Sequence, residues 1–167
     1  TKNLNGGYTG IPSGHNEIAT NEFARNNGIG SSSYAATLKQ ANYPYPLLTY
    51  AEVEFILAEA AFRGFISSDV ETHYNKAIEA SWRQWRCTWD GGAGTTYLNR
   101  AVVKYNNTLE RIMNQKYIAM FFSGYEAWYD YRRSGYPDLE IGPDVENGGI
   151  LPRRLEYPLI VRATNKA

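Results

Sequence analysis

The fold is decided by the stretch TYAEVEFILAEAAFRG, residues 49–64. Thr49 and Glu52 have the spacing of a capping box, in which the hydroxyl accepts from the N3 amide and the carboxylate reaches back to the N-cap amide. Apolar residues then recur at helical spacing, at Val53, Ile56, Leu57, Ala60 and Ala61. Gly64 can adopt the left-handed conformation that ends a helix. The stretch therefore predicts a helix that begins after Thr49, buries these five residues and ends near Gly64.

A second capping box, Ser68 to Glu71, follows after a short connection. The apolar face behind it comprises Val70, Tyr74, Ala77, Ile78, Ser81, Trp82 and Trp85. Two helices joined so closely predict an antiparallel hairpin. Its proportions fit a tetratricopeptide unit of about 34 residues, and they fit a generic helix pair with alanine in the seam equally well.

Two further helices are expected beyond the hairpin. The first begins at Asn107 with Glu110 three residues later, and its apolar stripe comprises Leu109, Ile112, Met113, Tyr117, Met120 and Phe121. A capping box from Ser123 to Glu126 predicts that the helical pattern kinks or restarts at Gly124 and continues toward Arg133. The segment GGAGTT, residues 91–96, is rich in glycine and predicts a flexible loop between the hairpin and these helices.

The two ends of the chain lack this periodicity. Residues 1–48 are rich in Gly, Asn, Ser and Pro and predict loops with short strands, and residues beyond Pro137 predict an irregular tail. The expected fold is therefore all-α, with tetratricopeptide-like helical hairpins and extensive loops. Its parts are a loop-rich lead-in at 1–48, a helical core at 49–133 and an irregular tail at 134–167 that packs on the same domain.

Composition narrows the classes of function. Lys plus Arg equals Asp plus Glu at 17 each, which disfavours bulk attraction to nucleic acid or anionic membranes. No apolar run approaches the roughly 20 residues of a membrane span, and residues 1–7 lack the pattern of a signal peptide. Cys87 has no partner for an intramolecular disulfide, and His15 and His73 have no ligand-spaced companions. No metal and no cofactor are predicted.

Trp89, Tyr97 and Asn99 flank the glycine-rich loop and are the candidate ligand-binding residues. Exposed aromatic rings offer flat apolar faces to sugar rings, and neighbouring amides supply donors and acceptors for hydroxyls. The alternative is that Trp82 and Trp89 pack in the core. These two interpretations stay open at this point.

No catalytic constellation is evident. Glu126 and Asp130 share a helix face and could pair as acid and base, but neighbouring arginines favour a structural ion network instead. Guanidinium groups can satisfy backbone carbonyls and carboxylates where irregular chain crosses helices. The predicted structural anchors, which pin the tail to the helices, are Arg132, Arg133, Arg153 and Arg154.

Several blocks resemble the SusD/RagB family of bacterial outer-membrane nutrient-binding lipoproteins. They are LLTYAEV at 47–53, AEAA at 58–61, QKYIAMF at 115–121, GYEAWYDYRRSGYP at 124–137 and PRRLEYP at 152–158. The blocks occur in family order and cover most of residues 44–158, and GYTGIPSG at 7–14 is similar to the family's entry into this half.

The resemblance implies a surface lipoprotein of a Gram-negative outer membrane that binds a glycan or another oligomeric nutrient and is not an enzyme. It implies a tetratricopeptide-like helical scaffold and a TonB-dependent, SusC-like transporter as partner. Family members are much longer and begin with a lipidated cysteine after a signal sequence. The chain is therefore expected to be the C-terminal part of a longer protein, with membrane contact only through an N-terminal lipid anchor that this sequence lacks. The alternative function is a helical-repeat protein-interaction module without carbohydrate binding.

Overall fold

The computed structural model describes residues 10–11, 13–26, 32, 34–145 and 147–164. Two units are distinguished, one formed by residues 44–139 and the other by residues 1–43 together with 140–167. In the described part of the chain the regular structure is helical and no residue lies in a strand. The predicted all-α class is confirmed.

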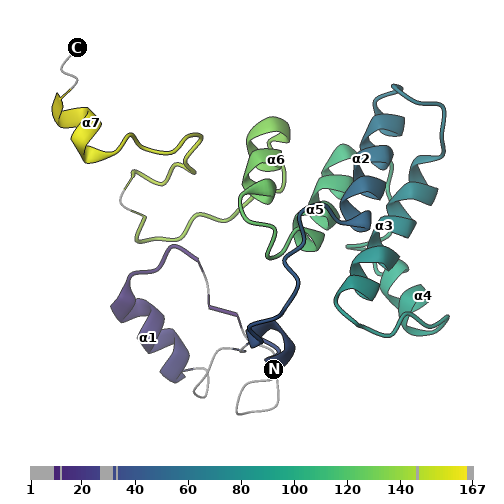
Figure 1. Ribbon diagram of the computed structural model, residues 1–167, viewed down its shortest axis with the longest axis horizontal. Helices are drawn as coiled ribbons and strands as arrows, with labels where there is room; N and C mark the ends of the chain where they lie inside the picture. Colours follow the sequence, from purple (N-terminus) through teal and green to yellow (C-terminus); the bar gives the residue numbers. More distant parts are fainter. Residues whose placement is uncertain (1–9, 12, 27–31, 33, 146, 165–167) are drawn as a thin grey trace. The chain divides into compact units, whose positions relative to one another are not determined.

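Helix α2, Tyr50–Phe62, has the ends that the sequence predicts (Figure 1). The Thr49 hydroxyl accepts a hydrogen bond of 3.1 Å from the Glu52 amide. At the other end Gly64 has φ +74°, its amide donates to the Ala61 carbonyl at 3.0 Å, and the Phe65 amide donates to the Ala60 carbonyl at 2.9 Å. This pair of bonds is a Schellman motif, which satisfies the last carbonyls of the helix.

Helix α3, Val70–Gln84, runs alongside α2 and completes the predicted hairpin (Figure 1). Its N-cap is Asp69, which accepts from the Thr72 amide at 2.7 Å, one residue later than the predicted Ser68. A carboxylate at this position also interacts favourably with the positive end of the helix dipole, so Asp69 is the better cap. The predicted inner face is confirmed, because Tyr74, Ala77 and Ile78 are buried.

The inner face predicted for α2 is only partly confirmed, because Val53, Leu57, Ala60 and Ala61 are half-buried. The residues that α2 buries are Ala51, Glu52, Glu54, Phe55, Ala58 and Glu59. Ile56, which was expected inside, is 46% exposed. Most sides of α2 carry apolar residues of the helix itself, so the periodicity of the sequence does not single out one buried face.

Helix α5, Leu109–Ala119, packs against both α2 and α3 (Figure 1). Its cap is Thr108, which accepts from the Arg111 amide at 3.2 Å, again one residue later than predicted. The apolar stripe predicted for this helix is partly confirmed. Ile112, Met113 and Met120 are buried, whereas Tyr117 and Phe121 are 40% and 50% exposed.

Helix α6, Glu126–Ser134, restarts after Gly124 as predicted. The capping box expected at Ser123 is wrong, because the N-cap is Tyr125 and makes no side-chain capping bond. The Ser123 hydroxyl is buried and has no hydrogen-bond partner. Gly124 has φ +63°, which turns the chain between α5 and α6.

The glycine-rich segment forms a short helix, α4, Ala93–Leu98, so the predicted flexible loop was wrong. Asp90 Oδ1 accepts from the Ala93 amide at 2.5 Å at the start of this helix. Gly94 is buried against the indole of Trp89. A tertiary contact therefore orders a segment whose composition favours a loop.

The second unit holds helix α1, Glu17–Asn26, the 3₁₀ helix η1, Ala36–Lys39, and helix α7, Leu159–Thr164. None of them was predicted, and α1 buries no residue, which explains its weak apolar signal. The described part of residues 1–48 contains no strand, contrary to expectation. Within the block at 7–14, residues 7–9 and 12 lie outside the described part. The packing of residues 134–167 on the helical core stays a prediction.

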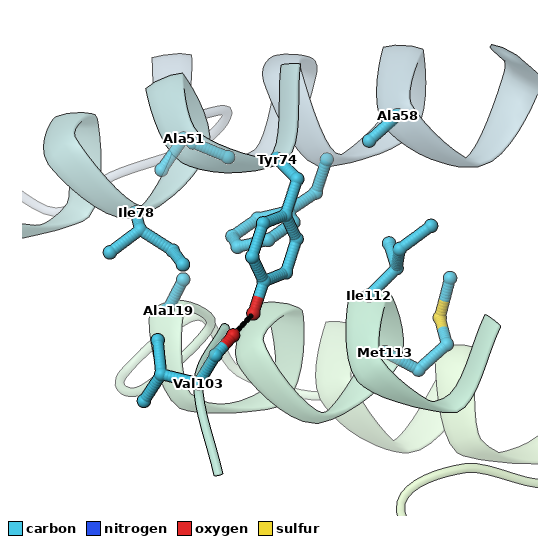
Figure 2. Close-up of a cluster of buried hydrophobic side chains, with 10 residues drawn as sticks. Ala51, Ala58, Tyr74, Ile78, Val103, Ile112, Met113 and Ala119 are labelled. Atoms are coloured by element: carbon cyan, nitrogen blue, oxygen red, sulfur yellow. Dashed lines mark hydrogen bonds between the residues drawn. The ribbon is translucent and has the colours of Figure 1, made fainter. Parts of the chain in front are cut away.

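The core of the first unit is centred on Tyr74 (Figure 2). Its ring meets Phe55 of α2 edge to face, with centroids 6.2 Å apart. Its hydroxyl donates to the Val103 carbonyl, and burial raises the pKa of Tyr74. The largest fully buried side chains are Tyr74, Phe55, Ile112 and Met113. The connection between α4 and α5 is therefore fastened to the helix pair by a buried hydrogen bond.

Replacing Tyr74 with Phe is expected to lower the free energy of unfolding by about 1–3 kcal/mol, because the buried Val103 carbonyl loses its donor. The matched control is Tyr105→Phe, since the Tyr105 hydroxyl makes an exposed bond of 3.2 Å to Asn107. That control is expected to change stability by less than about 0.5 kcal/mol. Chemical denaturation measures both, and equal losses would contradict the assigned role of the buried bond.

Candidate functional site

A groove of about 420 Å³ lies between α3 and the region around α4. Its lining residues are Thr72, Asn75, Lys76, Glu79, Trp89, Asp90, Gly91, Thr95 and Leu98. Thr72, Asn75, Lys76 and Glu79 of α3 occupy positions i, i+3, i+4 and i+7, so they share one face of that helix. The volume lies within the range of small-ligand sites.

Trp89 contributes an aromatic surface to this groove and is also held by the core. Its ring lies 5.3 Å from that of Trp82 at an interplanar angle of 77°. A Cβ atom placed on Gly94 would lie 2.7 Å from Trp89 Cε2, so the indole rests directly on the glycine backbone. Both roles considered for Trp89, groove lining and core packing, are thus compatible.

The other two predicted ligand-binding residues do not line the groove. The Tyr97 hydroxyl donates to Gln115 Oε1 at 3.0 Å, and the ring lies 5.3 Å from Trp82. Burial raises the pKa of Tyr97. Asn99 is exposed at the C-cap of α4. The structure therefore brings Trp89 and Tyr97 to the same indole, Trp82, and leaves Asn99 apart from the groove.

The polar residues of the groove were not predicted from the sequence. Two of them have structural partners: Glu79 accepts from Arg83 Nε at 2.8 Å and from Arg83 Nη2 at 2.6 Å, and Asp90 accepts from the Ala93 amide at the start of α4. Asn75 is half-buried, whereas Lys76 is exposed. The available signal was the spacing of polar residues on α3, opposite its apolar face. The site combines an aromatic face with amide, hydroxyl, ammonium and carboxylate groups.

Arg133 is an anchor, and the element that it fastens is α6. Its Nη1 donates to Glu59 Oε1 at 2.5 Å and its Nη2 to Glu59 Oε2 at 2.6 Å, which joins α6 to α2. Nη2 also donates to Asp130 at 2.8 Å, and Lys116 Nζ lies 2.6 Å from the other oxygen of Asp130. Asp130 thus belongs to an ion network, as the sequence indicated.

Burial would raise the pKa of Glu59, but hydrogen bonds from Arg133 and Arg63 outweigh burial and hold the pKa below its ordinary value. The guanidinium pair therefore keeps a nearly buried carboxylate ionised. Arg63 Nε donates to the same carboxylate at 2.8 Å.

The other predicted anchors make different contacts. Arg132 lies over the Trp128 ring, 4.8 Å from its centroid, and Arg154 lies 5.3 Å from the centroid of Tyr157. Arg153 is exposed and lines a recess formed by residues 152–157. That these arginines pin the tail to the helices stays a prediction.

Fold and groove together describe an α-helical protein with a solvent-open groove that is lined by polar groups and one indole. A model of the SusD-like family, described as starch-binding and associating with the outer membrane, matches residues 1–158. The chain belongs to this family. No curated protein matches it significantly.

Solved structures agree with this assignment. A SusD homologue from Bacteroides fragilis is 30% identical, with a TM-score of 0.75 over 93% of this chain and 38% of its own. A SusD-like protein of Bacteroidetes AC2a is 27% identical, with a TM-score of 0.69 over 88% of this chain and 32% of its own. A protein named as chitin-binding is 32% identical, with a TM-score of 0.58 over 70% of this chain and 27% of its own. The chain thus spans well under half the length of these structures.

None of the described helices is both long and apolar enough to cross a membrane. Within the residues that the structure describes, no group of three or more His, Cys, Asp or Glu side chains is arranged to hold a metal ion.

Replacing Gly94 with Ala is expected to displace the Trp89 indole and to cost about 1–3 kcal/mol of stability, because a Cβ would overlap the ring. Gly91→Ala is the matched control, since its Cβ would meet no atom within 4 Å. Near-ultraviolet circular dichroism reports the ring environment, and denaturation reports the stability. An unchanged tryptophan signal in Gly94→Ala would show that the indole does not rest on this glycine.

Replacing Glu59 with Gln is expected to lower stability at pH 7 by about 1.5–3 kcal/mol, because charge-assisted bonds from two arginines are weakened. The folded pKa is depressed, so the stabilisation is present above the ordinary value of 4.5 and is lost as the pH falls through the lower folded value. Urea denaturation between pH 7 and pH 3 should therefore show a flatter profile for the variant. The control is Glu126→Gln, because Glu126 is exposed on α6. If the stability of this control were as insensitive to pH as that of Glu59→Gln, the role assigned to the Glu59 carboxylate would be contradicted.

Proposed function

We propose that this protein captures a glycan at the cell surface of a Gram-negative bacterium, without cleaving it, for uptake through a TonB-dependent, SusC-like transporter. The observation that carries this proposal is the match of residues 1–158 to a family described as starch-binding and associating with the outer membrane. In this proposal the chain is part of a longer surface lipoprotein. One structural neighbour is itself named as chitin-binding, which supports a polysaccharide ligand.

The groove beside Trp89 has the chemistry that sugar recognition needs. Sugar rings place C–H groups against aromatic faces and exchange hydrogen bonds through their hydroxyls. Trp89 offers the aromatic surface, Asn75 offers an amide, and Thr72 and Thr95 offer hydroxyls along the same groove. We therefore assign the glycan contact within this chain to the groove.

The carboxylates of the groove favour binding over glycosidic cleavage. A glycosidase uses one carboxyl as a proton donor and a second as nucleophile or base. Glu79 is held by the guanidinium of Arg83 and Asp90 by the first turn of α4. Groups fixed in this way serve the fold.

A protein ligand is the second candidate, and one feature favours it. A recess of about 370 Å³ between α2, α5 and α6 has apolar walls at Ile56, Ala60 and Phe65 beside the Glu59 ion network. Ile56 and Phe65 are 46% and 78% exposed. Helical-repeat proteins use such surfaces to hold protein partners.

Calorimetric titration against maltooligosaccharides, chitooligosaccharides, mucin-type glycans and peptides tests the proposed function. Binding to at least one glycan is expected, and Trp89→Ala should weaken it at least about tenfold, or about 1.4 kcal/mol. Because Trp89 also packs in the core, Asn75→Ala serves as a second groove variant. Tyr117→Ala, on the exposed side of α5, is the matched control.

Two results would count against the proposal. Failure of every glycan to bind, together with binding of a peptide that Ile56→Glu abolishes, would favour the protein-interaction function. Loss of glycan binding in Tyr117→Ala but not in the groove variants would place the site elsewhere. Co-purification with a TonB-dependent transporter from outer membranes tests the uptake step separately.

A further inference from the structure

The turn that joins α2 to α3 holds a hydrogen-bonded serine, histidine and glutamate. Ser68 Oγ lies 2.7 Å from His73 Nε2, and His73 Nδ1 lies 2.6 Å from Glu54 Oε2. The hydroxyl and the carboxylate thus engage opposite nitrogens of one imidazole. This is the geometric signature of an activated nucleophile, its base and the group that orients the base.

The glutamate is kept in the form that this arrangement requires. Glu54 is 4% exposed, and the Tyr50 hydroxyl donates to its second oxygen. Burial would raise the pKa of Glu54, but hydrogen bonds from His73 and Tyr50 hold it below its ordinary value. An ionised carboxylate can only accept, so in its neutral form the imidazole carries its proton on Nδ1. The lone pair of Nε2 then faces the Ser68 hydroxyl.

The serine is accessible, and backbone donors follow it in the chain. Ser68 is exposed on the turn, two residues before the first residue of α3. The amides of Val70 and Glu71 belong to the first turn of this 15-residue helix and have no carbonyl acceptor within it. Amides without an acceptor in the helix can donate to developing negative charge.

We propose that Ser68 is a nucleophile that accepts the acyl group of a solvent-accessible carboxylic ester. His73 is its general base, and Glu54 is a positioning residue. Ser68 Oγ bonds to the ester carbonyl carbon while its proton passes to His73 Nε2, and the bond from that carbon to the alcohol oxygen then breaks. The alkoxide that leaves takes the proton from His73, so the products are acyl-Ser68 and a neutral alcohol. This reaction is independent of glycan capture in the groove beside Trp89.

A fluorophosphonate probe tests the nucleophile directly, because Oγ displaces fluoride from phosphorus and leaves a stable adduct. The purified chain should gain the mass of one probe less that of hydrogen fluoride, and peptide mapping should place the adduct on Ser68. Ser68→Ala should remove the labelling. His73→Gln should slow it by at least about 100-fold, the lower range for loss of a general base.

The neighbouring serine supplies the matched control, because Ser67→Ala should label at a rate within about twofold of the unchanged protein. Thermal melts of all variants separate lost reactivity from lost folding, and His73→Asn provides a second base variant if His73→Gln melts early. An unlabelled folded protein would overturn the proposal. Labelling that maps to another residue, or that persists at the same rate without an imidazole at position 73, would also overturn it. In either case the three side chains only hold the turn.

Discussion

The buried side chain of Tyr74 is the point on which the helical unit depends. Its ring contacts Phe55 of α2 and lies 5.4 Å from that of Tyr105, and its hydroxyl reaches the Val103 carbonyl. One residue of α3 thus fixes the neighbouring helix and the connection that leads to α5. A tyrosine suits this position because its ring supplies apolar contact and its hydroxyl satisfies a carbonyl that would otherwise be buried without a donor.

The groove follows from the same helix. Because α3 buries Tyr74, Ala77 and Ile78, its opposite face, with Asn75 and Glu79, is turned outward beside α4. The position of α4 depends in turn on the bond from the Ala93 amide to Asp90 and on the contact between Trp89 and Gly94. Substitutions in the core and in the groove are therefore coupled through one 15-residue helix.

The sequence predicted the helices well where local chemistry is sufficient. The cap at Thr49 and the stop at Gly64 are local features, and both are present. The observed caps Asp69 and Thr108 each lie one residue after the predicted cap. Adjacent side chains can all accept from a first-turn amide, so spacing alone does not choose among them.

The remainder depends on contacts between distant residues. Helix α4 was missed because contact with the half-buried Trp89 indole, and not helix propensity, orders the glycine-rich segment. Trp89 was chosen as a candidate because aromatic residues beside loops are conspicuous, but Asn75 resembles any polar residue on a solvent-facing helix. Arg133 was identified as an anchor, yet its partner Glu59 lies on another helix and cannot be read from spacing.

In the unit formed by residues 1–43 and 140–167, the close approach of Gly14 and Gly142 bears on the order in which the parts of the chain fold. The Asp144 amide bonds to the Gly14 carbonyl at 3.0 Å, and a Cβ on Gly142 would lie 2.3 Å from the Ser13 carbonyl oxygen. The Asn16 amide also donates to Asp144 Oδ2, and these two residues are 128 positions apart in the sequence. Closing so large a loop has an entropic cost that grows with its length, whereas the hairpin of α2 and α3 forms between sequence neighbours. We therefore expect the helical unit to form first and the contact between Gly14 and Gly142 to form later.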